Sequence, residues 1–73
     1  MPIIEVKLIE KVFSTAQKQE MITKITDAMV SIEGENLRPV TTVIIEEIPS
    51  GCWALGGKAL SSADVLAMAQ LAH

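Results

Sequence analysis

The sequence predicts an α+β fold: a βαβ protomer with parallel strands, a short C-terminal hairpin and a C-terminal helix, assembled as an oligomer. Three observations carry the βαβ part. Residues 3–9 alternate with a period of two, residues 15–32 hold apolar side chains at helical spacing, and residues 40–48 are rich in Thr, Val and Ile. Two strands joined by one long helix favour a parallel pair, because the helix carries the chain back across the sheet.

The expected oligomer follows from length and composition. The chain has 73 residues, which is one domain, residues 1–73. A domain of this size buries only about 60% of its unfolded surface and usually needs disulfides, metals or partners. One cysteine excludes an internal disulfide, and no Cys/His cluster has metal-ligand spacing. Because 49% of the residues are apolar and the mean hydropathy is +0.39, we expect a homo-oligomer to cover the excess apolar surface.

Composition also argues against several classes of partner. The net charge is −3 and the six basic residues are scattered, whereas nucleic acids favour a basic stripe. The aromatic residues are Phe13 and Trp53, too few for stacking on bases. No basic region followed by an apolar stretch predicts a signal peptide, and no apolar run approaches the roughly 20 residues of a membrane span. We therefore expect a cytoplasmic protein that binds neither nucleic acid nor membrane.

The long helix has a recognisable beginning and end. Ser14 and Gln17 match a capping box, so the helix is expected over residues 15–32. Gly34 is expected to end it as a left-handed C-terminal residue. The apolar stripe expected to pack in the core consists of Met21, Ile22, Ile25, Ala28, Met29 and Ile32.

The second half of the chain is predicted as loop, strand, hairpin and helix. Residues 35–39 read as a loop that ends in a proline, and the second strand is expected over residues 40–48. Residues 52–55 form a short apolar arm closed by Gly56 and Gly57, which suggests a hairpin. Residues 61–64 resemble a helix start, and the tail is expected to be an amphipathic helix that packs on a neighbour.

Most familiar catalytic arrangements are missing from the sequence. The single histidine is the final residue, His73, and chain ends fray, which argues against Ser-His-Asp and Cys-His sets. Cys52 has no evident base and reads as a small buried hydrophobe. Glu46 and Glu47 are adjacent on a strand, so they should face opposite sides as solvated or ion-paired residues. No phosphate loop or dinucleotide motif is present, and we expect neither a metal nor a cofactor.

Pro2 is the candidate that remains, and it has two interpretations. It can simply open an edge strand, where its missing N–H costs nothing. Alternatively, removal of Met1 turns it into a free secondary amine. Apolar surroundings disfavour the protonated form of such an amine and bring its pKa toward neutrality, where a general base works best.

Several short segments of the chain, in this order, resemble the 4-oxalocrotonate tautomerase family. They are the Met-Pro-Ile-Ile start, Glu10 before the helix cap, residues 43–49, and the Trp-Ala-Leu-Gly-Gly segment at residues 53–57. The resemblance covers residues 2–60. It implies a βαβ protomer that assembles as a hexamer. It also implies that Pro2 acts without a cofactor, as the base that moves a proton in enol or dienol acids.

The resemblance also indicates site residues. Well-studied members carry two arginines that bind the substrate carboxylate and stabilise charge on the carbonyl oxygen, and Val12 and Thr42 stand at those positions here. Lys11 and Arg38 lie close to them in sequence and are the candidate replacements. Trp53 matches the aromatic position that forms an apolar wall near the proline. We predict weak activity on the standard dicarboxylate substrate and consider a monoacid, such as the enol of phenylpyruvate, the better probe.

Two other functions fit the same scaffold. Relatives with this proline add water to unsaturated or halogenated acids, and Glu10, Glu46 or Glu47 would then have to activate the water. A non-catalytic oligomer, acting as a subunit of a mixed assembly or as a small-molecule binding protein, is favoured by the absence of both arginines.

Overall fold

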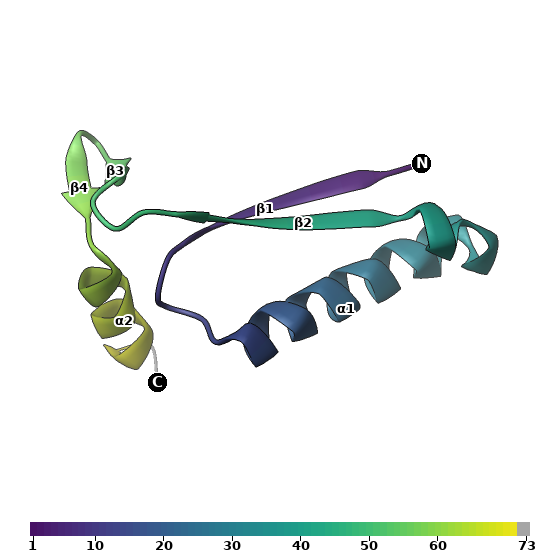
Figure 1. Cartoon of the computed structure of the whole chain (residues 1–73), viewed down its shortest axis with the longest axis horizontal. Coiled ribbons are helices and arrows are strands. Elements are labelled where there is room, and N and C mark those ends of the chain that lie inside the picture. The colour runs from purple at the N-terminus through teal and green to yellow at the C-terminus, as the bar shows by residue number, and fades with distance from the viewer. Residues whose placement is uncertain (72–73) are drawn as a thin grey trace.

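A computed structural model of the protein describes residues 1–71, with side chains as far as Gln70. Its elements, in chain order, are β1 (Ile3–Ile9), α1 (Thr15–Glu33), the 3-10 helix η1 (Glu35–Val40), β2 (Thr42–Ile48), β3 (Trp53–Leu55), β4 (Lys58–Leu60) and α2 (Ser62–Leu71) (Figure 1). Ala72, expected in the last helix, and His73 lie outside the described residues.

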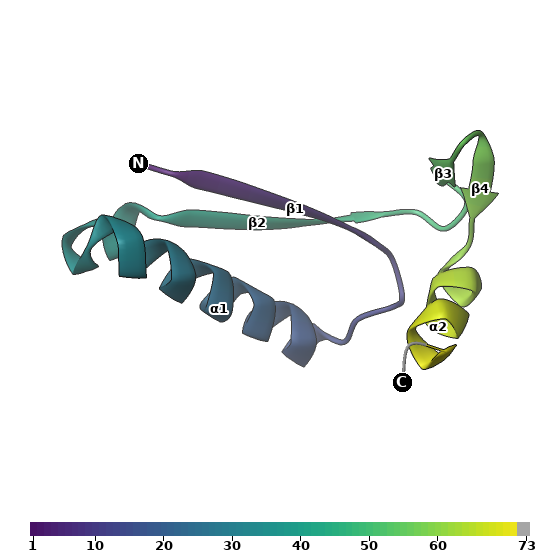
Figure 2. The same ribbon diagram turned by 180° about the vertical axis from the view of Figure 1, so that it is seen from behind.

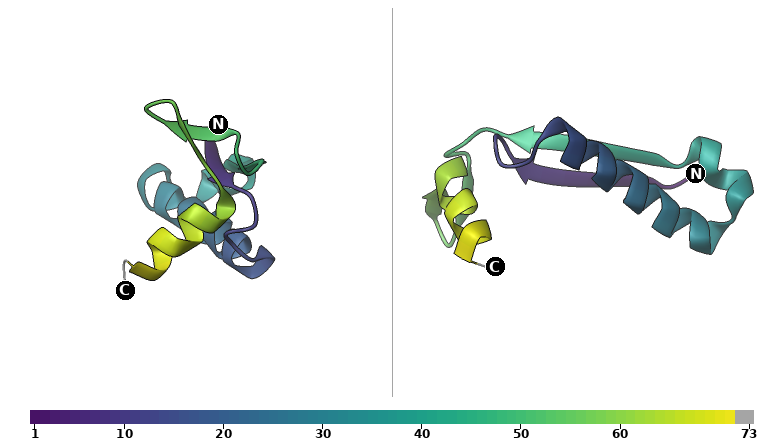
Figure 3. Two further views of the ribbon diagram at one scale, coloured as in Figure 1. Left: turned by 90° about the vertical axis from the view of Figure 1, so that its left-hand side faces the viewer. Right: turned by 90° about the horizontal axis from the view of Figure 1, so that it is seen from below.

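Strands β1 and β2 run parallel and are joined by α1, as predicted. Ile3 pairs with Thr42 at one end and Ile9 with Ile48 at the other. Figure 3 shows α1 lying along one face of this strand pair. The predicted βαβ fold with a C-terminal hairpin and helix is therefore confirmed.

The start of α1 is the predicted capping box, whereas its end differs from the prediction. The Ser14 Oγ accepts the Gln17 N–H at 3.1 Å, and Gln17 Oε1 accepts the Ser14 N–H at 2.8 Å. At the other end Gly34 has φ 102° and ψ 154°, which is extended rather than left-handed helical. That backbone region is open essentially to glycine alone. The predicted role of Gly34 as a helix-ending glycine holds, but its predicted conformation was wrong.

The segment after Gly34 is a 3-10 helix and not the predicted loop, and β2 begins at Thr42 and not at residue 40. Pro39 lies inside η1 because its fixed φ near −65° suits a 3-10 turn. The Thr41 N–H donates to the Arg38 carbonyl at 3.2 Å, which keeps residues 40 and 41 in the turn. The pairing of β2 with β1 therefore begins at Thr42.

The C-terminal part consists of the predicted hairpin and helix. Strands β3 and β4 pair antiparallel, with Trp53 opposite Leu60. Gly56 and Gly57 make the turn with φ values of 57° and 83°, which glycine adopts at no steric cost. Ser61 and Asp64 cap α2: the Asp64 N–H donates to Ser61 Oγ at 3.1 Å and the Ser61 N–H to Asp64 Oδ2 at 2.9 Å. The latter bond lowers the pKa of Asp64.

The protomer is elongated and has little core of its own. Its Cα radius of gyration is 14.9 Å, against about 11 Å for a compact domain of this length. Its accessible surface of 5269 Å² exceeds the roughly 4,400 Å² expected for its mass. Among the described side chains only Ile9, Val30 and Ser62 are buried. The hairpin and α2 form a separate lobe at one end of the sheet (Figure 2).

The apolar stripe of α1 is only partly covered. Val30, which lies outside the predicted stripe, is the buried residue of this helix, at 5% exposure. Ile32, predicted to pack in the core, is 86% exposed. Two strands are too narrow to cover so wide a stripe. An open apolar groove of about 280 Å³ remains, lined by Ile4, Ile25, Ala28, Met29 and Ile32. In the described part of the chain, neither helix has the length and apolar character needed to cross a membrane.

Candidate active site

Pro2 lies at the N-terminal end of the strand pair, next to the start of β2. Its carbonyl oxygen accepts the backbone N–H of Thr42 at 3.1 Å, and the residue is half-buried. This bond continues the pairing of β1 with β2 by one residue. It fixes the backbone of Pro2 beside Thr42, one of the predicted binding residues.

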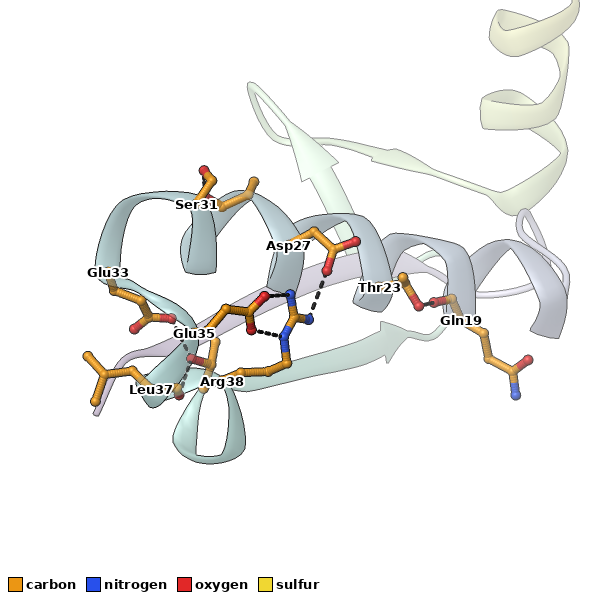
Figure 4. A network of polar contacts seen from close by, with 10 residues as sticks. Gln19, Thr23, Asp27, Ser31, Glu33, Glu35, Leu37 and Arg38 are labelled. Carbon is orange, nitrogen blue, oxygen red and sulfur yellow. Dashed lines mark hydrogen bonds and ion pairs between the residues drawn. The ribbon is translucent and has the colours of Figure 1, made fainter.

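Arg38 lies at the same end of the sheet, on η1, and is held by two carboxylates. Its Nε and Nη2 donate to the two oxygens of Glu35 at 2.7 and 3.1 Å, and its Nη1 donates to Asp27 at 2.8 Å (Figure 4). These bonds raise the pKa of Arg38, the Glu35 contribution being the larger, and lower the pKa of Glu35. Arg38 thus uses three of its five N–H donors, and two stay available.

Lys11 and Val12 lie at the opposite end of the sheet, in the loop after β1. Seven residues at about 3.3 Å each separate the two ends of β1 by roughly 20 Å. Lys11 has a positive φ of 62° and is exposed. The Glu47 carboxylate holds this loop, because it accepts Lys18 Nζ and the Lys11 backbone N–H, and both bonds lower the pKa of Glu47.

The neighbouring glutamate faces the other side of the strand pair. Glu46 accepts Lys7 Nζ at 3.3 Å, while Glu47 pairs with Lys18 on the side of α1. The prediction that the two glutamates are ion-paired on opposite faces is confirmed. Both carboxylates are therefore engaged, which weakens the case for either as a base that activates water.

An apolar cavity of about 330 Å³ lies at this end of the protomer, between the end of β1, the hairpin and α2. Its lining residues are Lys7, Leu8, Ile9, Phe13, Trp53, Leu55, Leu60, Val65 and Met68. Trp53 is half-buried and lines this cavity, whereas its predicted place near Pro2 stays a prediction. Lys7 is the one charged residue of the lining, and it is paired with Glu46.

The structure therefore divides the predicted site residues into two groups. Pro2, Thr42 and Arg38 share one end of the strand pair, while Lys11, Val12 and Trp53 share the other. Figure 1 shows this separation: the N-terminus lies at one end and the β3–β4 hairpin at the other. A single protomer does not bring the proline to the aromatic wall.

The sequence did not identify all of the cavity residues, and one of its assignments was wrong. Phe13, Val65 and Met68 line the cavity. Phe13 is one of the two aromatic residues of the chain, but nothing in the sequence connected it or α2 to the cavity. Cys52, predicted to be buried, is exposed because it lies in the turn between β2 and the hairpin. Within residues 1–71, no group of three His, Cys, Asp or Glu side chains is arranged to hold a metal ion.

Comparison with known proteins gives a consistent picture. A family model described as tautomerase enzyme matches residues 2–63. The chain is 31% identical over 62 residues to the probable tautomerase K2 of Dickeya dadantii (strain 3937), covering 84% of this chain and 90% of that protein.

Solved structures agree with the family match. The crystal structure of DmpI from Helicobacter pylori is 33% identical, with a TM-score of 0.68 over 80% of this chain and 94% of that one. TomN, a 4-oxalocrotonate tautomerase homologue of the tomaymycin biosynthetic pathway, is 26% identical, with a TM-score of 0.72 over 96% of this chain and 95% of that one. The resemblance stated from the sequence is confirmed, and the chain belongs to the tautomerase family.

Proposed function

We propose that the protein is a cofactor-independent tautomerase that moves a proton in enol or dienol forms of 2-oxo acids. Pro2, freed by removal of Met1, is the general base. The observation that carries this proposal is the hydrogen bond from the Thr42 N–H to the Pro2 carbonyl, which anchors the residue at the head of β1. An anchored backbone gives the amine a fixed direction, and a fixed direction is what efficient proton transfer requires.

The chemistry needs only an amine and a place for the negative charge. The Pro2 nitrogen removes the proton of the 2-hydroxyl group, the C2–O bond becomes a carbonyl, and the double bond shifts along the carbon chain. The prolinium then returns the proton to the carbon that has gained electron density. Charge develops on the C2 oxygen between these two steps and needs a hydrogen-bond donor.

The active site is completed between subunits of a homo-oligomer, for which the family resemblance suggests a hexamer. Pro2 and Trp53 belong to opposite ends of one protomer, so the proline of one subunit has to meet the wall of another. The elongated shape, the large accessible surface and the open groove along α1 all support such an assembly. Covering that groove with a second copy buries the exposed Ile32.

The substrate is a small carboxylic acid held by few cations. Arg38 keeps two N–H donors, and Thr42 lies next to Pro2. Lys11 is exposed at the other end of the strand pair, with Val12 and Trp53. Val12 is apolar and donates nothing from its side chain. Losing one donor to the developing oxyanion costs about 10²–10³ in rate. We therefore propose weak activity on a dicarboxylic 2-hydroxydienoate and better activity on a monoacid.

The test is the ketonisation rate of the enol of phenylpyruvate by wild type and Pro2→Ala, after mass spectrometry has shown Met1 to be absent from both. Pro2→Ala should reduce enzymatic proton transfer to background. Pro49→Ala, an exposed proline in the turn after β2, is the matched control and should keep full activity. Equal rates for wild type and Pro2→Ala would remove the mechanism.

A second candidate function is a non-catalytic subunit or small-molecule binding protein. The observation favouring it is that Arg38 is paired with two carboxylates, Glu35 and Asp27. Their two negative charges exceed its single positive charge, which leaves less attraction for a substrate carboxylate. Wild-type protein that lacks Met1, binds small acids and leaves every enol acid at its background rate would support this function. Water addition is less well supported, because Glu46 and Glu47 are ion-paired and Glu10 accepts the Ser50 N–H.

A further inference from the structure

Helix α2 forms one wall of the apolar cavity that contains Trp53. Val65 and Met68 are three residues apart, so they share one face of the helix, and both line the cavity. Phe13, from the loop before α1, lines the same space. The hairpin contributes Leu55 and Leu60, and the end of β1 contributes Leu8 and Ile9. Segments distant in sequence therefore line one apolar space.

The position of α2 is set by polar bonds at its first residue. Ser62 is 8% exposed; its Oγ donates to the Glu10 carbonyl at 2.5 Å and its N–H to Ser50 Oγ at 2.9 Å. The Ser50 N–H donates in turn to Glu10 Oε1 at 3.1 Å. This Ser62–Glu10–Ser50 clasp ties the start of α2 to the ends of both β1 and β2. Val65 follows one turn later, so the wall is positioned before any ligand binds.

The size and charge of the cavity define what fits in it. A cavity of about 150 Å³ lined by aliphatic and aromatic side chains holds benzene, and this one measures about 330 Å³. It therefore has room for an aryl ring or a branched alkyl group beyond the reacting carbons. Lys7 is its one charged lining residue and is already paired with Glu46 at 3.3 Å. A second carboxylate placed here would lose its hydration without gaining a partner.

We infer that Phe13, Val65 and Met68 form a specificity subsite for a bulky apolar substituent of an enol monoacid. The substituent is an aryl or branched alkyl group on the carbon chain, and α2 is the element that selects it. This inference rests on the proposed function, because the cavity is taken to adjoin the reacting carbons.

Binding is measured first, separately from catalysis. Trp53 is the only tryptophan of the chain and lies in the cavity wall, so its fluorescence reports occupancy. The probe is 3-phenylpropanoate, a monoacid with an aryl group and no enol. Val65→Phe fills the space and Met68→Ala removes part of the wall. Each should raise the Kd roughly fivefold to tenfold.

Controls for both changes are available on the same helix. Leu66 is 40% exposed and does not line the cavity. Leu66→Phe and Leu66→Ala should leave the Kd within about twofold of wild type, since surface changes away from a site have small effects. Circular dichroism shows whether each variant keeps its helices, and the two α2 variants change the cavity in opposite ways.

Catalysis then tests selectivity. The ratio of kcat/KM for the enol of phenylpyruvate to that for the enol of pyruvate should fall about tenfold in Val65→Phe, because the larger substituent loses its space. The ratio should be unchanged in Leu66→Phe.

The outcomes separate the two proposals. A Kd and a selectivity ratio that neither Val65→Phe nor Met68→Ala changes would overturn the subsite and leave the tautomerase function intact. Absence of 3-phenylpropanoate binding to wild type would also overturn it, since a neighbouring subunit would then occupy the cavity. If binding of 3-phenylpropanoate depends on Met68 but wild type converts no enol acid, the binding subsite is supported and the proposed tautomerase function fails.

Discussion

The backbone N–H of Thr42 donates to the carbonyl oxygen of Pro2 across 3.1 Å, and this bond places the residue before β1 at the start of β2. It exists because the η1 turn ends at Thr41 and releases the next residue to the sheet. Pro2 is therefore fixed by the sheet itself, whereas the aromatic wall of Trp53 lies beyond the far end of β1. Under the proposed function, a site that joins Pro2 to the Trp53 wall therefore requires at least two copies of the chain.

A charge placed in the open groove of α1 should break the assembly and the activity together. Ile32→Glu puts a carboxylate on a residue that is 86% exposed in the protomer and is covered in the proposed oligomer. We expect a smaller mass by native mass spectrometry and tautomerase activity near background. Ser31→Glu adds the same charge at the neighbouring exposed position and should preserve both. An active Ile32→Glu monomer would contradict a site shared between subunits.

Releasing Arg38 from its carboxylates should strengthen substrate binding. Glu35→Gln weakens the bonds to Nε and Nη2 while Asp27 continues to hold Nη1. A guanidinium with more free donors binds a carboxylate better, so KM for the phenylpyruvate enol should fall roughly twofold to fivefold. The thermal midpoint should change little, since exposed ion pairs contribute little to stability. An unchanged KM in Glu35→Gln, with Arg38→Gln also at the wild-type value, would exclude Arg38 from substrate binding.

Restoring a cation at position 12 should extend activity to dicarboxylates. Val12→Arg adds a bidentate donor in the loop after β1, at the position where well-studied members carry arginine. We expect kcat/KM on a dicarboxylic 2-hydroxydienoate to rise by roughly tenfold or more. Val12→Gln, which has similar bulk and no charge, should not produce this gain. The same rate for both variants would show that position 12 does not face the substrate.

The loop after β1 should loosen in acid through Glu47. The bonds from Lys18 and from the Lys11 N–H hold the pKa of this carboxyl below its ordinary value of 4.5. A depressed folded-state pKa contributes stability that is present above pH 4.5 and is lost as the pH falls through the lower value. The difference in urea midpoint between wild type and Glu47→Gln should therefore shrink between about pH 6 and about pH 3. A difference independent of pH would contradict the assignment.

Local patterns in the sequence were enough to predict the strands, the hairpin and the two α-helices, but not the 3-10 helix η1. The Ser14–Gln17 capping box set the start of α1, and the Gly56–Gly57 pair marked the hairpin turn, because both signals act within a few residues. The start of β2 was misplaced, since the 3-10 turn around Pro39 depends on bonds to α1 that a local pattern does not show. Apolar spacing likewise could not tell which part of the α1 stripe a single protomer covers.

The site was less accessible to sequence reasoning because its parts are brought together from far apart. Asp27 and Arg38 are eleven residues apart and meet only when η1 folds back on α1. Ser62 reaches Glu10 across 52 residues of sequence. The proposed meeting of Pro2 with Trp53 crosses a subunit boundary. Residue types nominated Pro2 as the base and the family resemblance nominated Trp53 as the aromatic wall, while the surroundings of both came from the fold.

The central claim is that the amine of Pro2 is the base, and it is tested most directly by measuring one preparation before and after removal of Met1. Protein that retains Met1 carries an amide at the Pro2 nitrogen, which is not basic. Treatment with a methionine aminopeptidase exposes the amine without altering any side chain. Ketonisation of the phenylpyruvate enol should rise from background to the full enzymatic rate in step with the loss of Met1 seen by mass spectrometry. A rate that is the same before and after removal would contradict the claim.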